Sequence, residues 1–256
     1  MSLLTAQGVS VRLGGTTIVQ GANLSLRGGE LVALVGPNGA GKTTLMRALA
    51  GLVPATGSIM LGGQPLDSMK PRDRARHIAY LPQGHIFHWP MAVASIVMLG
   101  RAPHADPFSS TSAQDHAAVE RALMTTETLS FAERAVTTLS GGEKARVALA
   151  RALATQAPVL LADEPTAALD PRHQLVVMEL LRNAARAGNA VLAIMHDLTL
   201  AARFADRVLV MDRGRIVADA PPTKAFAPER LAAVFGIQAV SVEVGDKRVP
   251  IAGRAL

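Results

Sequence analysis

A glycine-rich segment near the start of the chain has the residue types and spacing of a phosphate-binding loop. Residues 36–43 match G-x-x-x-x-G-K-[ST] between an apolar run and a helix-competent stretch. Glycines let backbone N–H groups turn toward a phosphate chain, and the N-terminus of the following helix adds a positive dipole. We expect Lys42 to neutralise the terminal phosphates and the Thr43 hydroxyl to bind Mg²⁺. An ordinary glycine-rich turn would explain the glycines but not the lysine and threonine.

Two adjacent acids, Asp163 and Glu164, follow the apolar run of residues 159–162. The end of a buried strand has no use for two carboxylates unless something there requires negative charge, as a magnesium–phosphate complex does. We expect Asp163 to hold the metal, through water, and Glu164 to polarise an attacking water. Alone, the pair would be more simply interpreted as a solvated strand end. Together with the phosphate loop it indicates a P-loop nucleoside triphosphatase.

A third segment, Leu-Ser-Gly-Gly-Glu at residues 139–143, precedes an apolar-periodic stretch that predicts a helix over 141–155. A serine hydroxyl and consecutive N–H groups at a helix start can bind an anion. Ser140 is equally suited to be an ordinary N-cap residue. The segment lies between the phosphate loop and the acidic pair, in a part of the chain without predicted strands.

The elements that must position these residues alternate between strands and helices. The first thirty residues alternate apolar and polar positions around glycine pairs, which predicts an antiparallel β region. Residues 31–35 form a continuous apolar run, typical of a strand buried on both faces. Further strands are predicted at 57–61, 78–81, 159–162, 190–195 and 206–211, with helices at 42–50, 71–77, 171–187 and 197–204.

Between about residues 90 and 155 only helices are predicted, over 92–99, 112–129 and 141–155. We therefore expect an α/β fold: a P-loop core with a mostly parallel sheet, an N-terminal antiparallel β region and an inserted α-helical subdomain. One nucleotide-binding domain would span residues 1–237. The tail, residues 238–256, is predicted to form a β-hairpin that turns at Gly245 and Asp246.

Further short motifs follow the phosphate loop in a fixed order, and the whole set resembles the ATP-binding subunits of ABC transporters over about residues 3–237. These motifs are Tyr-Leu-Pro-Gln at 80–83, Leu-Ser-Gly-Gly-Glu at 139–143, Asp-Glu-Pro-Thr at 163–166, Ala-Leu-Asp at 168–170 and Met-His-Asp at 195–197.

The resemblance implies ATP as the nucleotide and a role for each motif. Gln83 would ligate Mg²⁺ together with Thr43 and Asp163 and connect the site to a membrane partner, and His196 would contact the γ-phosphate. Two copies would pack head to tail, with Asp170 in the loop that couples them. The implied ATP-binding residues are Gly36, Pro37, Asn38, Gly39, Ala40, Gly41, Lys42, Thr43 and Thr44. The residues that would face the ATP of the other copy are Ser140, Gly141, Gly142 and Glu143.

One position departs from the family pattern. The family usually has an aromatic residue in the first β region that stacks on adenine, and Leu13 occupies the matching position. Stacking on an aromatic ring contributes about 1–3 kcal/mol. We therefore expect weak discrimination between ATP and GTP.

Several details resemble importers of iron chelates (siderophores, haem) and cobalamin, in particular residues 99–104, Glu143 and the His173-Gln174 pair. The implied partners are a second copy, two membrane permease subunits and, indirectly, a substrate-binding protein, with this chain at the cytoplasmic face of the membrane. An importer ATPase for another cargo is one alternative. A soluble ABC ATPase that acts on nucleic acid or ribosomes and a P-loop kinase or GTPase are the others.

Composition narrows these alternatives. The net charge is +6, but the Lys and Arg residues are dispersed and aromatic residues make up 3% of the chain, so we expect no nucleic-acid partner. The densest basic group, residues 72–77, predicts a solvated helix face. No cysteine is present, which excludes thiol chemistry. No apolar run reaches the length of a membrane-spanning helix.

His85 and His88 could suggest a metal site, although a packing or interface role is the preferred interpretation.

Overall fold

The computed structural model describes residues 2–84, 87–106, 110–245 and 247–256. Its central sheet has the order β10-β9-β3-β8-β7-β6, and only the edge strand β10 runs antiparallel to its neighbour. This confirms the predicted α/β fold with a mostly parallel sheet. The strands are β3 Glu30–Val35, β6 Ile78–Leu81, β7 Val159–Ala162, β8 Ala190–Ile194, β9 Arg207–Asp212 and β10 Arg215–Ala220.

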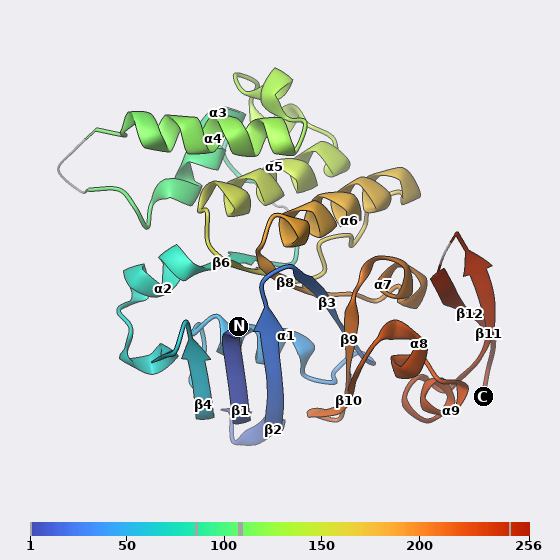
Figure 1. The fold of residues 1–256 in the computed structure, drawn as a ribbon. Helices are drawn as coiled ribbons and strands as arrows, with labels where there is room; N and C mark the ends of the chain where they lie inside the picture. The colour runs from blue at the N-terminus through green and yellow to red at the C-terminus, as the bar shows by residue number, and fades with distance from the viewer. Residues whose placement is uncertain (1, 85–86, 107–109, 246) are drawn as a thin grey trace.

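A second sheet, with the order β2-β1-β4-β5, is antiparallel throughout. Figure 1 shows it below the central sheet, with the chain's N-terminus on β1. It confirms the antiparallel region predicted from the alternating pattern. Its strands are β1 Ser2–Leu13, β2 Thr16–Arg27, β4 Thr56–Leu61 and β5 Gln64–Pro65.

Helices cover both faces of the central sheet, which is why its strands are apolar at consecutive positions. In β3, Val32 and Leu34 pack in one core with α1 and the antiparallel sheet, whereas Leu31 and Ala33 pack in another core with α5, α6 and α7. The α-helices are α1 Lys42–Leu49, α2 Pro71–His77, α3 Val93–Met98, α4 Ala113–Thr125, α5 Gly141–Ala154, α6 Pro171–Arg186, α7 Leu198–Phe204, α8 Pro222–Ala225 and α9 Pro228–Arg230.

The helical region, residues 90–155, has an apolar core of its own built from α3, α4 and one face of α5. Figure 1 shows these helices stacked above the sheet. Helix α4 ends at Thr125, four residues before the predicted end. The hydroxyl of Thr126, which is fully buried, donates to the Ala122 carbonyl at 3.0 Å, and Glu127 follows with a positive φ of 53°. Short 3-10 turns occupy Leu66–Ser68, Leu99–Arg101, Leu129–Phe131 and Val136–Thr138.

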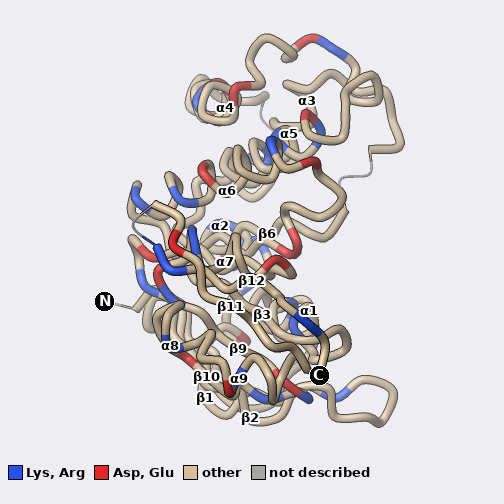
Figure 2. Tube along the Cα trace, turned by 90° about the vertical axis from the view of Figure 1, so that its right-hand side faces the viewer, with Lys and Arg blue, Asp and Glu red and all other residues tan. Residues whose placement is uncertain are grey.

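Helix α2 carries the basic group that was predicted to be a solvated face. The helix has no buried residue, in agreement with that prediction. Arg72 and Arg76 also each donate to the carbonyl of Pro103 at 2.9 Å, and Arg72 donates to that of Ala105. The helix therefore ties the sheet-bearing part of the chain to the start of the helical region. Figure 2 shows Lys and Arg on both parts of the molecule rather than in one stripe.

The C-terminal residues form a hairpin of β11 Ile237–Val244 and β12 Lys247–Ala255, which follows a π-helical turn at Leu231–Phe235. It does not project freely: Val249 is fully buried in the core that contains α7, and the Thr199 hydroxyl donates to the Pro250 carbonyl at 2.9 Å. Asp246, at the predicted turn, lies outside the described residues. Across the part of the chain that the structure describes, no helix combines the length and hydropathy needed to span a membrane.

Candidate nucleotide-binding site

The phosphate loop, residues 36–44, joins β3 to α1 and depends on glycine at particular positions. Gly39 and Gly41 have φ of 78° and 96°, a conformation that costs other residues free energy. Gly41 is also the N-cap of α1, and a Cβ there would lie 2.9 Å from the Ile18 carbonyl oxygen of β2. The loop can therefore stay folded against β2, at the N-terminus of a helix whose dipole favours an anion.

Lys42 lies inside this loop and is 6% exposed. Its Nζ donates to the carbonyl oxygens of Gly36 at 2.8 Å and Pro37 at 3.0 Å. Burial lowers the pKa of Lys42, and the nearby carboxylates Glu164 and Asp163 oppose that shift. A partly desolvated cation that donates to backbone carbonyls is well suited to attract a phosphate anion.

Asp163 lies at the end of β7, fully buried, and accepts two hydrogen bonds from hydroxyl groups. Thr43 Oγ1 and Tyr80 Oη each donate to its carboxylate at 3.1 Å. Burial raises the pKa of Asp163, and the hydrogen bonds from Tyr80 and Thr43 lower it. The structure thus joins Asp163 to the phosphate loop through Thr43. Tyr80 was missed as a partner, although the parallel pairing of β6 with β7 places it beside this strand end.

Glu164 is held by two residues that the sequence also singled out. Its Oε1 lies 2.6 Å from His196 Nε2, and its Oε2 accepts from Gln83 Nε2 at 2.7 Å. The three residues follow β7, β8 and β6, whose carboxyl ends meet at one edge of the sheet, where ligands of α/β folds bind. Glu164 has a positive φ of 52°, which is uncommon outside glycine and typical of functional sites.

The donor set fits a magnesium ion. The Thr43 hydroxyl, the Asp163 carboxylate and the Gln83 side-chain carbonyl are oxygen ligands of the kind Mg²⁺ prefers. The Gln83 nitrogen is engaged with Glu164, which leaves its oxygen available. No group of three or more His, Cys, Asp or Glu side chains able to hold a metal occurs in residues 2–84, 87–106, 110–245 and 247–256. His85, one of the two histidines considered as a metal pair, lies outside those residues.

The signature segment, residues 140–143, is not brought to this loop. Ser140 is the N-cap of α5: its hydroxyl accepts from Glu143 N at 3.3 Å, and Glu143 Oε2 accepts from Ser140 N at 2.7 Å. This reciprocal capping box lowers the pKa of Glu143. Asp170, the N-cap of α6, likewise pairs with His173. Among the described residues, no hydrogen bond or ion pair joins either segment to the phosphate loop.

Leu13 ends β1 and pairs with Thr16 across the Gly14-Gly15 turn, with 44% of its surface exposed. Its exposure means that an aromatic side chain could replace it without displacing core residues. A nucleotide base bound at this turn would therefore contact the aliphatic side chain of Leu13, not an aromatic ring.

Comparison with known proteins places these motifs in a family. A model of the ABC transporter family matches residues 19–167. The hemin import ATP-binding protein HmuV of Streptomyces coelicolor is 49% identical over 91% of this chain and 83% of its own length. The cobalamin import ATP-binding protein BtuD of Halobacterium salinarum is 43% identical over 91% of this chain and 58% of its own length.

A solved structure of the ATP-binding cassette MJ0796, dimeric and bound to ADP and Pi, aligns with a TM-score of 0.74 and 26% identity. The alignment covers 86% of this chain and 98% of that one. The two chains therefore share their fold over most of their length. The chain belongs to the ABC transporter family and is an ATPase component of it.

Proposed function

We propose that this chain is the ATPase subunit of an importer for an iron chelate (a siderophore or haem) or cobalamin. It would drive uptake through partner membrane permeases by ATP-dependent closure of two copies. Relatives that cover most of this chain are named as hemin and cobalamin import proteins, which supports that cargo class. The observation that supports ATP hydrolysis is the position of Glu164, which contacts His196 and Gln83 beside the phosphate loop.

Glu164 has the position and partners of a catalytic base. His196 and Gln83 each engage one of its carboxylate oxygens, so the group has a fixed orientation. A water on the γ-phosphate side would pass a proton to Glu164 as its oxygen bonds to phosphorus and the bond to ADP breaks. Thr43, Asp163 and Gln83 would hold Mg²⁺, which neutralises charge on the phosphate oxygens.

We infer that two copies are needed, because, in the part of the chain that the structure describes, the signature segment and Asp170 are not bonded to the phosphate loop of their own chain. Ser140 and Glu143 cap the N-terminus of α5, and Asp170 caps that of α6. Within the described ranges, no hydrogen bond or ion pair joins them to their own phosphate loop. In a head-to-tail pair they would reach the ATP of the other copy. ATP would then bind the closed pair more tightly than the open one, and this difference in affinity drives closure.

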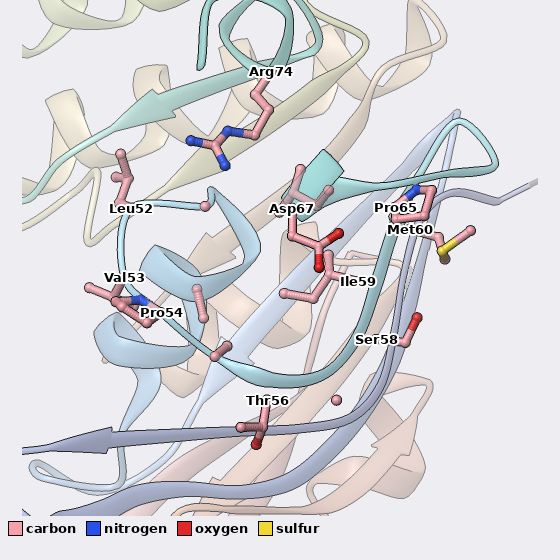
Figure 3. Close-up of a pocket in the computed structure, with 15 residues that line it drawn as sticks. Leu52, Val53, Pro54, Thr56, Ser58, Ile59, Met60, Pro65, Asp67 and Arg74 are labelled. Carbon is pink, nitrogen blue, oxygen red and sulfur yellow. The ribbon is translucent and has the colours of Figure 1, made fainter. Parts of the chain in front are cut away.

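A groove beside the site provides a surface for the membrane permeases. It has a volume of about 420 Å³ and runs between α2, the Leu99–Arg101 turn and α5. Leu52 and Leu99, 58% and 52% exposed, lie on its rim, and Tyr80, which bonds Asp163, lies in its wall. A second cavity of about 510 Å³, shown in Figure 3, continues from Leu52 and Arg74 toward β4. A permease segment in the groove would thus contact Tyr80, whose hydroxyl donates to the proposed metal ligand Asp163.

Two experiments test this function. The tagged chain, purified from detergent-solubilised membranes of the cells that make it, should carry permease subunits, whereas copurification with nucleic acid would contradict the proposal. Uptake of radiolabelled haem, a ferric siderophore and cobalamin should be compared in cells with the wild-type chain or with Glu164→Gln. Loss of uptake of one of these compounds in the variant is expected. Unchanged uptake of all three would contradict the assigned cargo class.

A further inference from the structure

The first turns of α5 and α6 meet at one point, where His173 packs against Gly142. A Cβ at Gly142 would lie 2.6 Å from His173 Nε2 and closer still to two carbons of the ring. Real Cβ atoms do not approach other atoms so closely, so a larger residue at position 142 would require the imidazole to move. The middle of the signature segment is therefore shaped around the imidazole of a residue some thirty positions further along the chain.

The ring itself is fixed by Asp170. One carboxylate oxygen of Asp170 accepts from the backbone N–H of His173 at 3.0 Å, and the other accepts from His173 Nδ1 at 2.6 Å. A carboxylate can only accept, so Nδ1 carries the hydrogen. With Nδ1 bonded to Asp170, the opposite edge of the ring, which includes Cδ2 and Nε2, faces Gly142. His173 thus links the N-cap of α6 to the first turn of α5.

Asp170 is in turn connected to Glu164 by a short, internally bonded segment. Ala167 N donates to the Glu164 carbonyl at 3.1 Å, and the side-chain nitrogen of Gln174 donates to the Thr166 carbonyl at 3.4 Å. Gln174 N also donates to the Asp170 carbonyl at 3.0 Å. A displacement of Glu164 can therefore pass along this segment to Asp170, then through the imidazole to Gly142.

We propose that His173 is a positioning residue that joins the Asp170 loop and the signature segment of one copy into a single unit. Both elements then reach the ATP of the other copy together, and the state of Glu164 in one site affects the contacts offered to the other. This inference rests on the proposed head-to-tail dimer. His173 does not contact the reacting atoms of its own site, so ATP binding by a single copy does not depend on it.

The test measures ATP-dependent dimerisation of the full chain by analytical ultracentrifugation, in a Glu164→Gln background that retains bound ATP. His173→Ala removes both contacts of the ring. His173→Asn keeps an N–H donor for Asp170 but lacks the edge that packs on Gly142. His116→Ala is the matched control, because His116 is an exposed histidine of α4 whose ring bonds only Thr111 among the described residues.

We expect both His173 variants to weaken the ATP-bound dimer by about tenfold or more, the range expected for losing a hydrogen bond to a charged group or a packed ring. His173→Asn should keep the melting temperature and the affinity of the monomer for ATP. The His116→Ala control should match the Glu164→Gln parent in all three measurements.

Three results would overturn the inference. His173→Asn could dimerise as tightly as the parent, which would show that the Gly142 contact contributes nothing. Dimerisation and melting temperature could fall in parallel in both variants, which would indicate a merely structural role. A Glu164→Gln parent that stays monomeric with ATP would contradict the proposed function itself, and the inference with it.

Discussion

The buried ion pair between Arg101 and Asp115 allows a quantitative test of what holds the helical region together. Arg101 Nε lies 2.8 Å from Asp115 Oδ1, and the two residues are 4% and 8% exposed. Arg101 Nη1 also donates to the Ala154 carbonyl at 2.8 Å and to Gln156 Oε1 at 3.1 Å. One guanidinium thus connects α4 to the end of α5. Arg101→Met removes it and keeps the apolar stem.

Removing one partner of a buried pair costs about 3–5 kcal/mol, because the remaining charge stays buried and loses its ionic partner. For a chain of this size each kcal/mol lowers the melting temperature by about 2–4 °C, so we expect a fall of roughly 6–20 °C. Denaturant unfolding followed by circular dichroism measures the free energy directly. Arg121→Met, at an exposed position of α4, is the control. A loss below about 1 kcal/mol, equal to the control, would refute the reasoning.

The same pair predicts a pH dependence. Hydrogen bonds from Ser112 and then Arg101 lower the pKa of Asp115 to about 2. An aspartate in the unfolded chain has a pKa of about 3.9. A carboxyl group whose pKa is lower in the folded state contributes stability above the unfolded pKa and loses it as pH falls through the folded value. The wild type should therefore lose stability between about pH 5 and pH 2, and Arg101→Met should lose less over that range.

Three further substitutions test the nucleotide site. Lys42→Ala should abolish binding of a fluorescent ATP analogue, because it removes the buried cation of the phosphate loop; retained affinity would contradict that role. Asp163→Asn should leave the fold intact and weaken the Mg²⁺ dependence of ATP hydrolysis, measured by metal titration; an unchanged titration curve would exclude Asp163 as a ligand. Leu13→Tyr should tighten ATP binding by about 5- to 150-fold, as expected for base stacking, in a competition assay. The wild type should hydrolyse ATP and GTP at similar rates, and a strong preference for ATP would show that Leu13 is not at the base.

Sequence patterns predicted the features that depend on neighbouring residues. The continuous apolar run before Gly36 requires a strand covered on both faces, and β3 is such a strand. The phosphate loop and the Asp163-Glu164 pair could be placed because a motif and its flanking elements lie within a few positions of each other. Parallel strands then bring their carboxyl ends to one edge, which is why Gln83, Glu164 and His196 meet.

Contacts between segments that are far apart in the chain could not be predicted from local sequence patterns. The hydrogen bond from Tyr80 to Asp163 depends on which strands are neighbours in the sheet. Nothing in the basic group on α2 indicates that Arg72 and Arg76 would find the carbonyl of Pro103. Gly142 has the appearance of a flexible position in sequence, yet the ring of His173 packs where its side chain would be. Such pairings arise only once the chain has folded.

We propose that Glu164, held by His196 and Gln83, supports hydrolysis of ATP enclosed between two copies of this chain. Glu164→Gln keeps the size of the side chain and removes its capacity to accept a proton. The direct measurement is phosphate release per copy, with sedimentation of the same sample in ATP. We expect hydrolysis to fall by about 10²- to 10⁴-fold while ATP stays bound and the dimer accumulates. Near-normal phosphate release, or a chain that stays monomeric with bound ATP, would contradict the account.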